Sequence, residues 1–197
     1  MSLMLLAASF LMVRGFRNSL DEGIGFPKER LLMVRFDPRL MQFSAEQTQQ
    51  FYRQLTERAR SLGGVRTVGL TQNPPLGLDD FDTVEFVPEG FQMPRDRQSF
   101  RSAMDTVDEG YFETMGVPIL AGRGFTASDR AGSAPVAVVN EYLARRYWPG
   151  EDVIGKTIRV GGQAVRIVGM AQTLKYRVTF EKPEDFIYLP LAQRAVA

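Results

Sequence analysis

Apolar positions recur along this chain with two periods, and the clearest run has the helical period. Between residues 45 and 62 the apolar side chains are spaced four and three residues apart: Phe51, Leu55, Ala59 and Leu62. This spacing predicts a helix over 45–62 with one apolar face. Ser44 with Gln47 three residues later matches a capping box, and Gly63–Gly64 follow where helices commonly end.

Two stretches that flank this helix have the two-residue period of strands. Residues 31–37 read LLMVRFD and residues 65–70 read VRTVGL, so both are predicted to be strands, the second ended by Asn73–Pro75. The resulting strand–helix–strand unit is about 40 residues long, which is enough for the crossover that two parallel strands require. We expect this unit to form half of a small α+β layer.

From residue 79 onward the pattern predicts a β-rich lobe. Four strands are expected: 83–87, 100–107, 134–139 and 186–191. The last of them ends at Pro190 and is expected at a sheet edge, because proline cannot donate to a ladder. Alternating residues in 158–169 predict a hairpin that turns at Gly161–Gly162.

Two short helices are predicted within this lobe. One covers 108–115 with Asp108 as N-cap, and the other covers 140–148 with Asn140 as N-cap. Their inward-facing side chains are expected to be Tyr111, Phe112, Met115, Leu143 and Tyr147. The fold class is therefore α+β, with a split strand–helix–strand layer and a mixed β-rich lobe that carries short helices.

Composition removes most kinds of catalytic site. The 197 residues carry a net charge of +1 and contain no cysteine and no histidine. Without them the chain has no disulfide, no thiol nucleophile, no Ser-His-Asp triad and no His-ligated metal. The near-neutral charge, without a basic stripe, argues against nucleic acid as a partner. No catalytic, cofactor-binding or metal-binding residue is predicted, and the chain is predicted not to be an enzyme.

A complete phosphate-loop pattern is present in Gly150, Gly155, Lys156 and Thr157. In nucleotide-binding proteins this loop follows a strand and opens a helix, whereas here it follows the predicted helix 140–148 and precedes a strand. Two acidic residues, Glu151 and Asp152, also lie inside the loop. We therefore interpret the motif as a structural turn.

Two other patterns suggest ligands. Residues 78–90 hold five acids and no base: Asp79, Asp80, Asp82, Glu85 and Glu89. A calcium loop that begins at Asp80 needs glycine at its sixth position, where this chain has Glu85, so we expect a solvated acidic loop. Gly122-Arg123-Gly124 opens like a dinucleotide fingerprint, but residue 127 is alanine and no suitable helix follows.

The N-terminal segment Leu3–Val13 is eleven residues without a charge, which is shorter than the roughly 20 apolar residues of a membrane span. Three interpretations compete: the core of a signal peptide, an amphipathic core helix, or the outer end of a truncated transmembrane helix. A signal peptide is the least favoured, because neither a basic region before the segment nor a cleavage site after it is present.

Short motifs follow one another in a characteristic order: Tyr111–Phe112, Met115–Val117, Leu120–Arg123, Phe125, Asp129, Val138–Glu141, Trp148–Gly150, Ile154–Lys156, Val168–Gly169 and Tyr188–Leu191. Each is weak alone, but the ordered set resembles the extracytoplasmic core domain of MacB/FtsX-like ABC-transporter permeases, in particular the large orphan permeases. The resemblance covers nearly the whole chain, from about Met4 to Gln193.

This resemblance implies an organisation in three parts. Residues 1–27 are expected to be the outer end of a transmembrane or stalk helix and a turn, which favours the truncated span among the three interpretations. Residues 28–78 are expected to be the strand–helix–strand half of a porter-like layer, and residues 79–197 the mixed α+β lobe. A second strand–helix unit completes the layer in the family, so we expect this layer to be incomplete, with an exposed edge that favours homodimers.

The resemblance also implies a function and partners. It implies a non-catalytic domain on the periplasmic side of the inner membrane, which transmits ATP-driven motion to an extracytoplasmic substrate or partner. ATP is then hydrolysed by a separate ABC ATPase domain or subunit, and a periplasmic adaptor or lipoprotein is a further partner. Apart from the resemblance, the predicted helix 140–148 is either an ordinary packed helix or one that also contacts a partner through the adjacent Arg145 and Arg146.

Two other classes of function stay open at this point. A membrane-tethered ligand-binding sensor domain would show an aromatic-lined pocket with convergent polar groups. A carboxylate-dependent hydrolase would need two acids in one cleft, and Asp108 with Asp129 is the nearest candidate pair.

Overall fold

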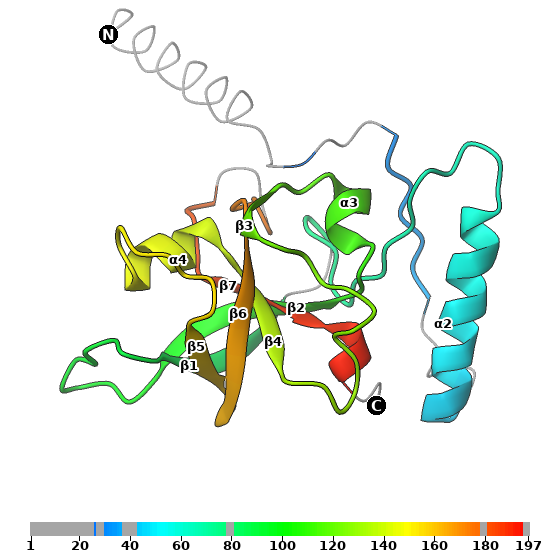
Figure 1. Ribbon diagram of the computed structural model, residues 1–197. Coiled ribbons are helices and arrows are strands. Elements are labelled where there is room, and N and C mark those ends of the chain that lie inside the picture. Colours follow the sequence, from blue (N-terminus) through cyan, green and yellow to red (C-terminus); the bar gives the residue numbers. More distant parts are fainter. Residues whose placement is uncertain (1–25, 27–29, 37–42, 78–80, 178–180, 195–197) are drawn as a thin grey trace, which may run out of the picture.

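The computed structural model describes residues 26, 30–36, 43–77, 81–177 and 181–194. The elements in these residues are α2 (Ala45–Arg60), β1 (Asp82–Pro88), β2 (Phe100–Val107), α3 (Tyr111–Met115), β3 (Ile119–Gly122), β4 (Val136–Asn140), α4 (Glu141–Tyr147), β5 (Thr157–Val160), β6 (Gln163–Ala171), β7 (Phe186–Pro190) and the 3-10 helix η2 (Leu191–Gln193) (Figure 1). This arrangement of a mixed sheet with short helices confirms the predicted α+β class.

Six of the strands form a closed ring. The strand order is β3-β6-β4-β7-β2-β1-β5, and β5 also pairs with β6, so the sheet closes on itself and β3 is added outside the ring. The pairs β2–β7 and β4–β6 are parallel and the remaining pairs are antiparallel. Closure leaves the six strands of the ring without unpaired edges.

Two hydrophobic clusters occupy the two sides of this ring. One contains residues from all six ring strands and from α4, including Phe86, Ile158, Ile167 and Ile187. Because alternate residues of a strand point to opposite faces, this cluster must lie inside the ring. The other cluster lies outside, where α3 and residues 172–176 cover β2, β4 and β7.

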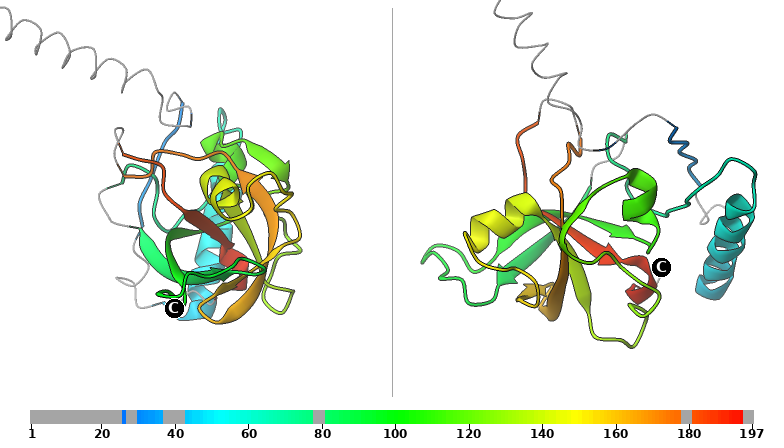
Figure 2. Two further views of the ribbon diagram at one scale, coloured as in Figure 1. Left: turned by 90° about the vertical axis from the view of Figure 1, so that its left-hand side faces the viewer. Right: turned by 45° about the horizontal axis from the view of Figure 1, so that its top comes forward.

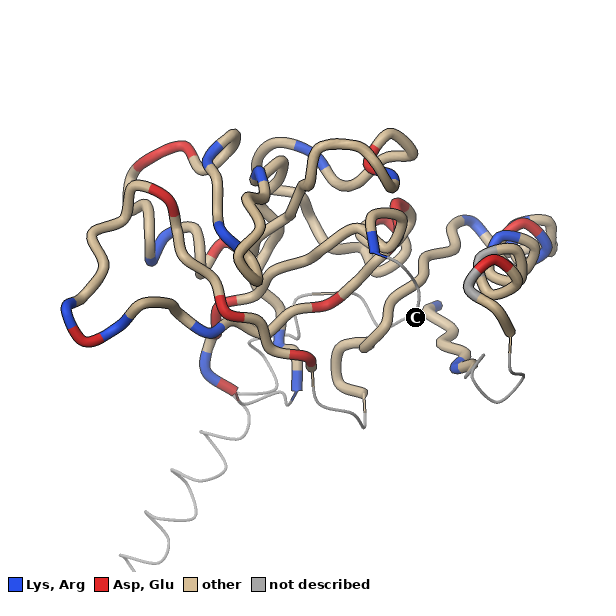
Figure 3. Tube along the Cα trace, turned by 90° about the horizontal axis from the view of Figure 1, so that it is seen from below, with Lys and Arg blue, Asp and Glu red and all other residues tan. Residues whose placement is uncertain are grey.

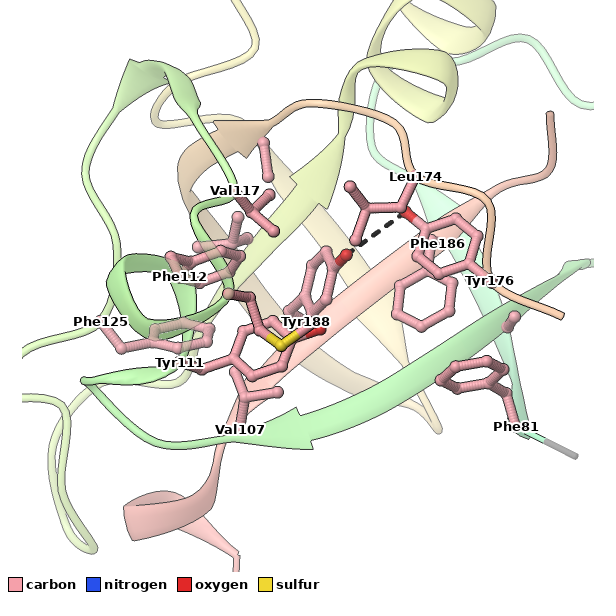
Figure 4. Close-up of a cluster of buried hydrophobic side chains, with 14 of the residues drawn as sticks. Phe81, Val107, Tyr111, Phe112, Val117, Phe125, Leu174, Tyr176, Phe186 and Tyr188 are labelled. Carbon is pink, nitrogen blue, oxygen red and sulfur yellow. Dashed lines mark hydrogen bonds between the residues drawn. The ribbon is translucent and has the colours of Figure 1, made fainter. Parts of the chain in front are cut away.

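The outer cluster is largely aromatic. Phe186 of β7 stacks on Tyr176 with ring centroids 3.9 Å apart and an interplanar angle of 5°. The Tyr188 hydroxyl donates to the Tyr176 hydroxyl at 3.3 Å (Figure 4). The Asn140 amide donates to the same oxygen at 3.3 Å. These hydrogen bonds satisfy phenol groups that would otherwise be costly to bury.

Strand β7 corrects the prediction that residues 186–191 lie at a sheet edge. All five residues of β7 are buried, and the strand lies between β4 and β2 near the centre of the sheet. Pro190 is tolerated because it is the last residue of the strand, where its missing N–H removes no hydrogen bond from the middle of the ladder.

Several local predictions are confirmed in the lobe. The β5–β6 hairpin turns at Gly161 and Gly162, whose φ angles of 56° and 86° suit glycine. Helix α4 is capped by Asn140, whose Oδ1 accepts from the Leu143 amide at 3.0 Å. The prediction that Asp108 caps α3 is wrong, because the N-cap is Gly110 and no side chain caps the helix.

Helix α2 stands beside the sheet rather than against either of its faces (Figures 1 and 2). The predicted capping box is present: the Gln47 amide donates to Ser44 Oγ at 3.2 Å, and the Ser44 amide donates to Gln47 Oε1 at 2.8 Å. Phe51 packs edge-on against Phe36, with ring centroids 6.0 Å apart. We call residues 43–73 the helical arm and the described residues from 81 to 194 the sheet lobe.

The prediction of strands on both sides of α2, over 31–37 and 65–70, is wrong for the residues that the structure describes. Residues 31–36 and 65–70 form no regular structure, and the adjacent Thr71 forms an isolated antiparallel bridge with Val107 of β2. A strand needs a neighbouring chain for its backbone hydrogen bonds, and no described segment supplies one here. Large apolar side chains in and near these described segments are exposed: Leu32, Met33, Val34, Phe36, Leu62 and Val65.

The predictions for the N-terminal segment and the domain limits are not tested by this structure. Leu3–Val13 lies outside the described residues, as do residues 27–29 and 78–80 around the two predicted boundaries. Within the described ranges, no helix is both long enough and apolar enough to cross a membrane.

Candidate functional site

The arm is joined to the lobe along a short seam, which consists of residues 69–73 on the arm side and residues 105–111 on the lobe side. Two backbone hydrogen bonds cross it: the Gln72 amide donates to the Thr106 carbonyl at 3.0 Å, and the Asp108 amide donates to the Leu70 carbonyl at 3.0 Å. The antiparallel bridge between Thr71 and Val107 lies between them. Residues 69–73 are therefore bonded directly to the end of β2 and to the turn that follows it.

The side chain of Asp105, on β2, forms hydrogen bonds across the middle of the seam. Its Oδ1 accepts from the Asn73 amide at 3.0 Å and from the Thr106 amide at 2.7 Å, and its Oδ2 accepts from the Thr71 hydroxyl. The residue is only 1% exposed. Burial raises the pKa of Asp105 to about 7, although the Thr71 hydroxyl and the backbone amides of Asn73, Thr106 and Gln72 act in the opposite direction.

Asp108 forms the second carboxyl contact of the seam. Its Oδ1 accepts from the Leu70 amide at 2.9 Å and from the Gly110 amide at 3.1 Å. Burial raises the pKa of Asp108 to about 6, while Arg60 on α2 lowers it and Glu109 raises it slightly. The side chain expected to cap α3 thus binds the arm instead.

Two glycines allow the backbones to meet at the seam. A Cβ atom on Gly110 would lie 2.2 Å from the Val68 carbonyl oxygen, and one on Gly69 would lie 2.7 Å from the Tyr111 Cα. Both obstacles are backbone atoms and cannot rotate away as a side chain can. The seam is therefore a close contact in which any side chain at Gly110 would separate arm and lobe.

Sequence reasoning missed Asp105. Its only local signal is a single acid within the otherwise uncharged second half of the strand FRSAMDTV, and a buried acid needs a partner. The partners lie 32 and 34 residues earlier in the chain, so the sequence alone does not connect them.

Asp108 and Asp129, the pair suggested for a hydrolase, share no hydrogen-bond partner and no ion-pair partner among the described residues. Asp129 is held by Arg123 through bonds of 2.6 and 2.9 Å, and it also accepts from the Thr126 amide at 2.8 Å. The Arg123 guanidinium lowers the pKa of Asp129, so this carboxylate stays ionised as part of a structural pair. Asp108 has its own partners in the seam.

The two arginines predicted as a partner surface differ in their surroundings. Arg146 Nη1 donates to Asp185 Oδ2 at 3.0 Å, and the same oxygen accepts from the Tyr147 hydroxyl at 2.9 Å, so Arg146 is held by the residue that immediately precedes β7. Arg145 forms an i,i+4 ion pair with Glu141 at 2.6 Å, and 77% of its side chain is exposed. Of the two, Arg145 projects further into solvent.

The phosphate-loop pattern lies between α4 and β5, the helix-then-strand order that led us to interpret it as a turn. Lys156 Nζ forms an ion pair with Glu151 Oε2 at 2.7 Å and lies 6.0 Å from the centre of the Trp148 ring. The lysine that would bind phosphate is thus engaged by an acid of its own loop.

The acidic stretch contributes hydrogen bonds rather than a cluster of ligands. Asp82 accepts from the Gln72 side chain at 3.0 Å, and Glu85 accepts from the Ser99 hydroxyl at 3.1 Å, while Asp79 and Asp80 lie outside the described residues. In the part of the chain that the structure describes, no group of three acids could hold a metal ion. Acidic and basic residues are both distributed along the described chain (Figure 3).

An open hollow of about 420 Å³ lies between α4 and the β1–β2 loop. Aromatic rings line it, and charged side chains contribute to its wall: Phe91, Phe100, Tyr147, Asp96, Arg97 and Arg146. Because Arg146 is already held by Asp185, few polar groups remain to converge on a ligand. This hollow does not meet the criterion set for a sensor domain.

Comparison with known families assigns the chain. The model of the family described as "MacB-like periplasmic core domain" matches residues 1–196. The chain belongs to this family. The domain is also 20% identical, over 121 residues, to the uncharacterized ABC transporter permease YknZ of Bacillus subtilis strain 168. That alignment covers 59% of this chain and only 30% of YknZ, so the domain spans less than a third of this relative.

Two solved structures are similar to the domain. The periplasmic region of MacB from Actinobacillus actinomycetemcomitans is 18% identical with a TM-score of 0.49, and the match covers 70% of this chain and 53% of that one. The extracellular domain of the transporter YknZ from Gram-positive bacteria is 15% identical with a TM-score of 0.47. That match covers 69% of this chain and 60% of the YknZ domain.

Proposed function

We propose that this domain is a non-catalytic part of an ABC-type permease of the inner membrane, on its periplasmic side. In this proposal an ABC ATPase domain or subunit drives the membrane part, and the domain passes the motion to a substrate or partner outside the membrane. A periplasmic adaptor or lipoprotein is the partner class we favour. Residues 1–27, 28–78 and 79–197 remain the proposed division into stalk, half-layer and lobe.

The observation that carries this proposal is the seam. A part that transmits force needs a firm connection between the segment that is moved and the segment that acts. The seam provides one through two cross-backbone hydrogen bonds, the buried carboxyl group of Asp105, the half-buried one of Asp108, and a close backbone contact at Gly110. The sheet lobe beyond it is a closed ring of strands, which suits a body that moves as a unit.

Weakening the seam should uncouple the lobe from the membrane. In the permease that carries this domain, reconstituted with its ATPase, one label is placed on the membrane part and one at Gln163→Cys, an exposed lobe position in a chain without cysteine. ATP is expected to change the distance between the labels. Asp105→Ala should abolish this change while ATP hydrolysis continues, because three hydrogen-bond donors of the seam lose their acceptor.

The exposed residue Asp96, in the β1–β2 loop, supplies the matched control, since Asp96→Ala removes an acid far from the seam. It should leave the ATP-dependent distance change intact. If ATP does not move the lobe at all, or moves it equally with Asp105→Ala, the coupling role is wrong.

Two surfaces are proposed for contacts with other chains. The exposed apolar side chains of the arm region, including Val34, favour a homodimer. Arg145 on α4 favours a partner that presents an acidic surface, with Arg146 beside it. The two surfaces lie on opposite sides of the sheet lobe in Figure 1, so they can be tested separately.

One substitution is made in each surface, Val34→Asp and Arg145→Glu, and each variant is the control for the other. Val34→Asp should remove any concentration-dependent dimer seen in sedimentation without weakening adaptor binding, because it places a charge in the apolar patch. Arg145→Glu should weaken adaptor binding several-fold and leave the dimer unchanged. Equal effects of both variants in both assays would contradict this assignment.

A further inference from the structure

The two carboxyl groups of the seam remain able to form their contacts after protonation. The Thr71 hydroxyl donates to Asp105 Oδ2, and a hydroxyl can equally accept a hydrogen bond from a protonated carboxyl group. The Asn73 and Thr106 amides both donate to the other oxygen, Oδ1. At Asp108 both donors, Leu70 and Gly110, use Oδ1, and Oδ2 is left to carry a proton. Neither contact to the arm is lost on protonation.

The surroundings of these groups disfavour their ionised forms. Within the described residues, no lysine or arginine forms an ion pair with Asp105. The titratable groups that interact with Asp105 are Tyr111 of α3 and Tyr188 of β7, and those that interact with Asp108 are Glu109 of the β2–α3 turn and Arg60 of α2. Arg60 alone among them is cationic, and it acts on Asp108.

We propose that the seam is a proton-linked clasp, in which arm and lobe hold together more firmly when Asp105 and Asp108 are protonated and separate more readily when both are ionised. Its use as a regulator of coupling rests on the proposed function. The clasp itself is a property of the described chain. Its ligand is the proton, and its two states are the closed seam and one in which residues 69–73 leave β2.

The direction of the pH effect follows from linkage. In the open state both carboxyl groups are hydrated and have their ordinary pKa values near 4. In the closed state burial raises the pKa of Asp105 to about 7 and that of Asp108 to about 6. Between pH 4 and pH 7 the closed state therefore binds more protons than the open state. The free energy by which protonation favours closure is complete at low pH and is lost as pH rises through 6 and 7.

Residue-resolved amide exchange of the 197-residue chain between pH 5 and pH 8 tests the clasp. The amides of Gln72, Asn73 and Asp108 report the seam, and that of Gly155, which donates to Ile167 at 2.8 Å, reports the lobe. After correction for intrinsic exchange, protection at the seam should fall by roughly tenfold or more from pH 5 to pH 8. Protection at Gly155 should change much less.

Asparagine substitutions separate protonation from other effects of pH. Asp105→Asn imitates the protonated acid, because its amide can donate to Thr71 and its oxygen can still accept from Asn73. With Asp108→Asn in addition, protection at the seam should become nearly independent of pH. The control Asp96→Asn, at an exposed site, should behave like the parent chain.

The outcomes are distinguishable. Seam protection that follows the lobe reference at every pH would overturn the clasp, and so would double-asparagine variants that keep the pH dependence of the parent chain. If a variant does not fold, the carboxyl carbon shifts of Asp105 and Asp108 in the parent chain decide, since ordinary titration near pH 4 contradicts the clasp. The experiment contains neither membrane nor ATPase, so its failure leaves the coupling role untouched, and the reverse also holds.

Discussion

Gly110→Ala is expected to open the seam while the sheet lobe stays folded. The backbone of Gly110, with φ −84° and ψ −11°, is one that alanine adopts without strain, so the added methyl group alone causes the effect. That group would lie 2.2 Å from the Val68 carbonyl oxygen and 3.5 Å from the Gly69 Cα. Separating these backbones should destabilise the closed seam by about 1–3 kcal/mol.

The rate of trypsin cleavage after Arg66 measures this opening. Arg66 is the arginine of the arm that lies nearest to the seam in the sequence. Because 1.4 kcal/mol corresponds to tenfold in an equilibrium, cleavage should accelerate about five- to a hundred-fold. Gly63→Ala is the matched control, since nothing lies within 4 Å of a Cβ atom at that position. Equal cleavage of the two variants, or loss of the folded lobe in Gly110→Ala, would show that the contact does not hold arm and lobe together.

Phe186→Ala should have the largest effect on the stability of the lobe. Phe186 is fully buried on β7, stacks on Tyr176, and meets Phe81 and Tyr188 with centroid distances of 5.0 and 4.8 Å (Figure 4). Removing a ring of this kind from a core costs about 3–5 kcal/mol, because the surrounding side chains cannot close the cavity. Such a loss is a large part of the stability of a typical domain.

Urea unfolding measures this loss as a change in the free energy of unfolding. The control is Leu120→Ala, which truncates an apolar side chain that is 45% exposed and should cost less than about 1 kcal/mol. A Phe186→Ala variant that unfolds at the same urea concentration as this control would contradict the central position assigned to β7.

Local chemistry made several elements predictable. Helix α2 follows from one apolar face and a capping box whose two partners are three residues apart. The β5–β6 hairpin follows from the paired glycines at its turn, and α4 from the Asn140 cap. The order of helix and strand around Lys156 likewise sufficed to interpret the phosphate-loop pattern as a turn. In each case the interacting groups are close neighbours in the chain.

Other features were not predictable because their partners are distant in sequence. Residues 31–36 have the composition of a strand, but no described segment lies alongside to form a ladder. Pro190 indicated an edge, whereas pairing with β2 and β4 places β7 at the centre. Asp108 looked like a helix cap, the only role visible from its neighbours, until Leu70, 38 residues away, was found to donate to it.

The sequence by itself determined the α+β class, the positions of the short helices and most strands, and the resemblance to an extracytoplasmic permease domain. These depend on periodicity, caps and ordered motifs, which are local properties of a chain. Only the tertiary structure decided that six strands close into a ring, that Asp105 is buried beneath the arm, and that Arg146 is held by Asp185 while Arg145 projects further into solvent. Each of these depends on which distant backbone or charged group comes within hydrogen-bond reach, and burial then sets its energy.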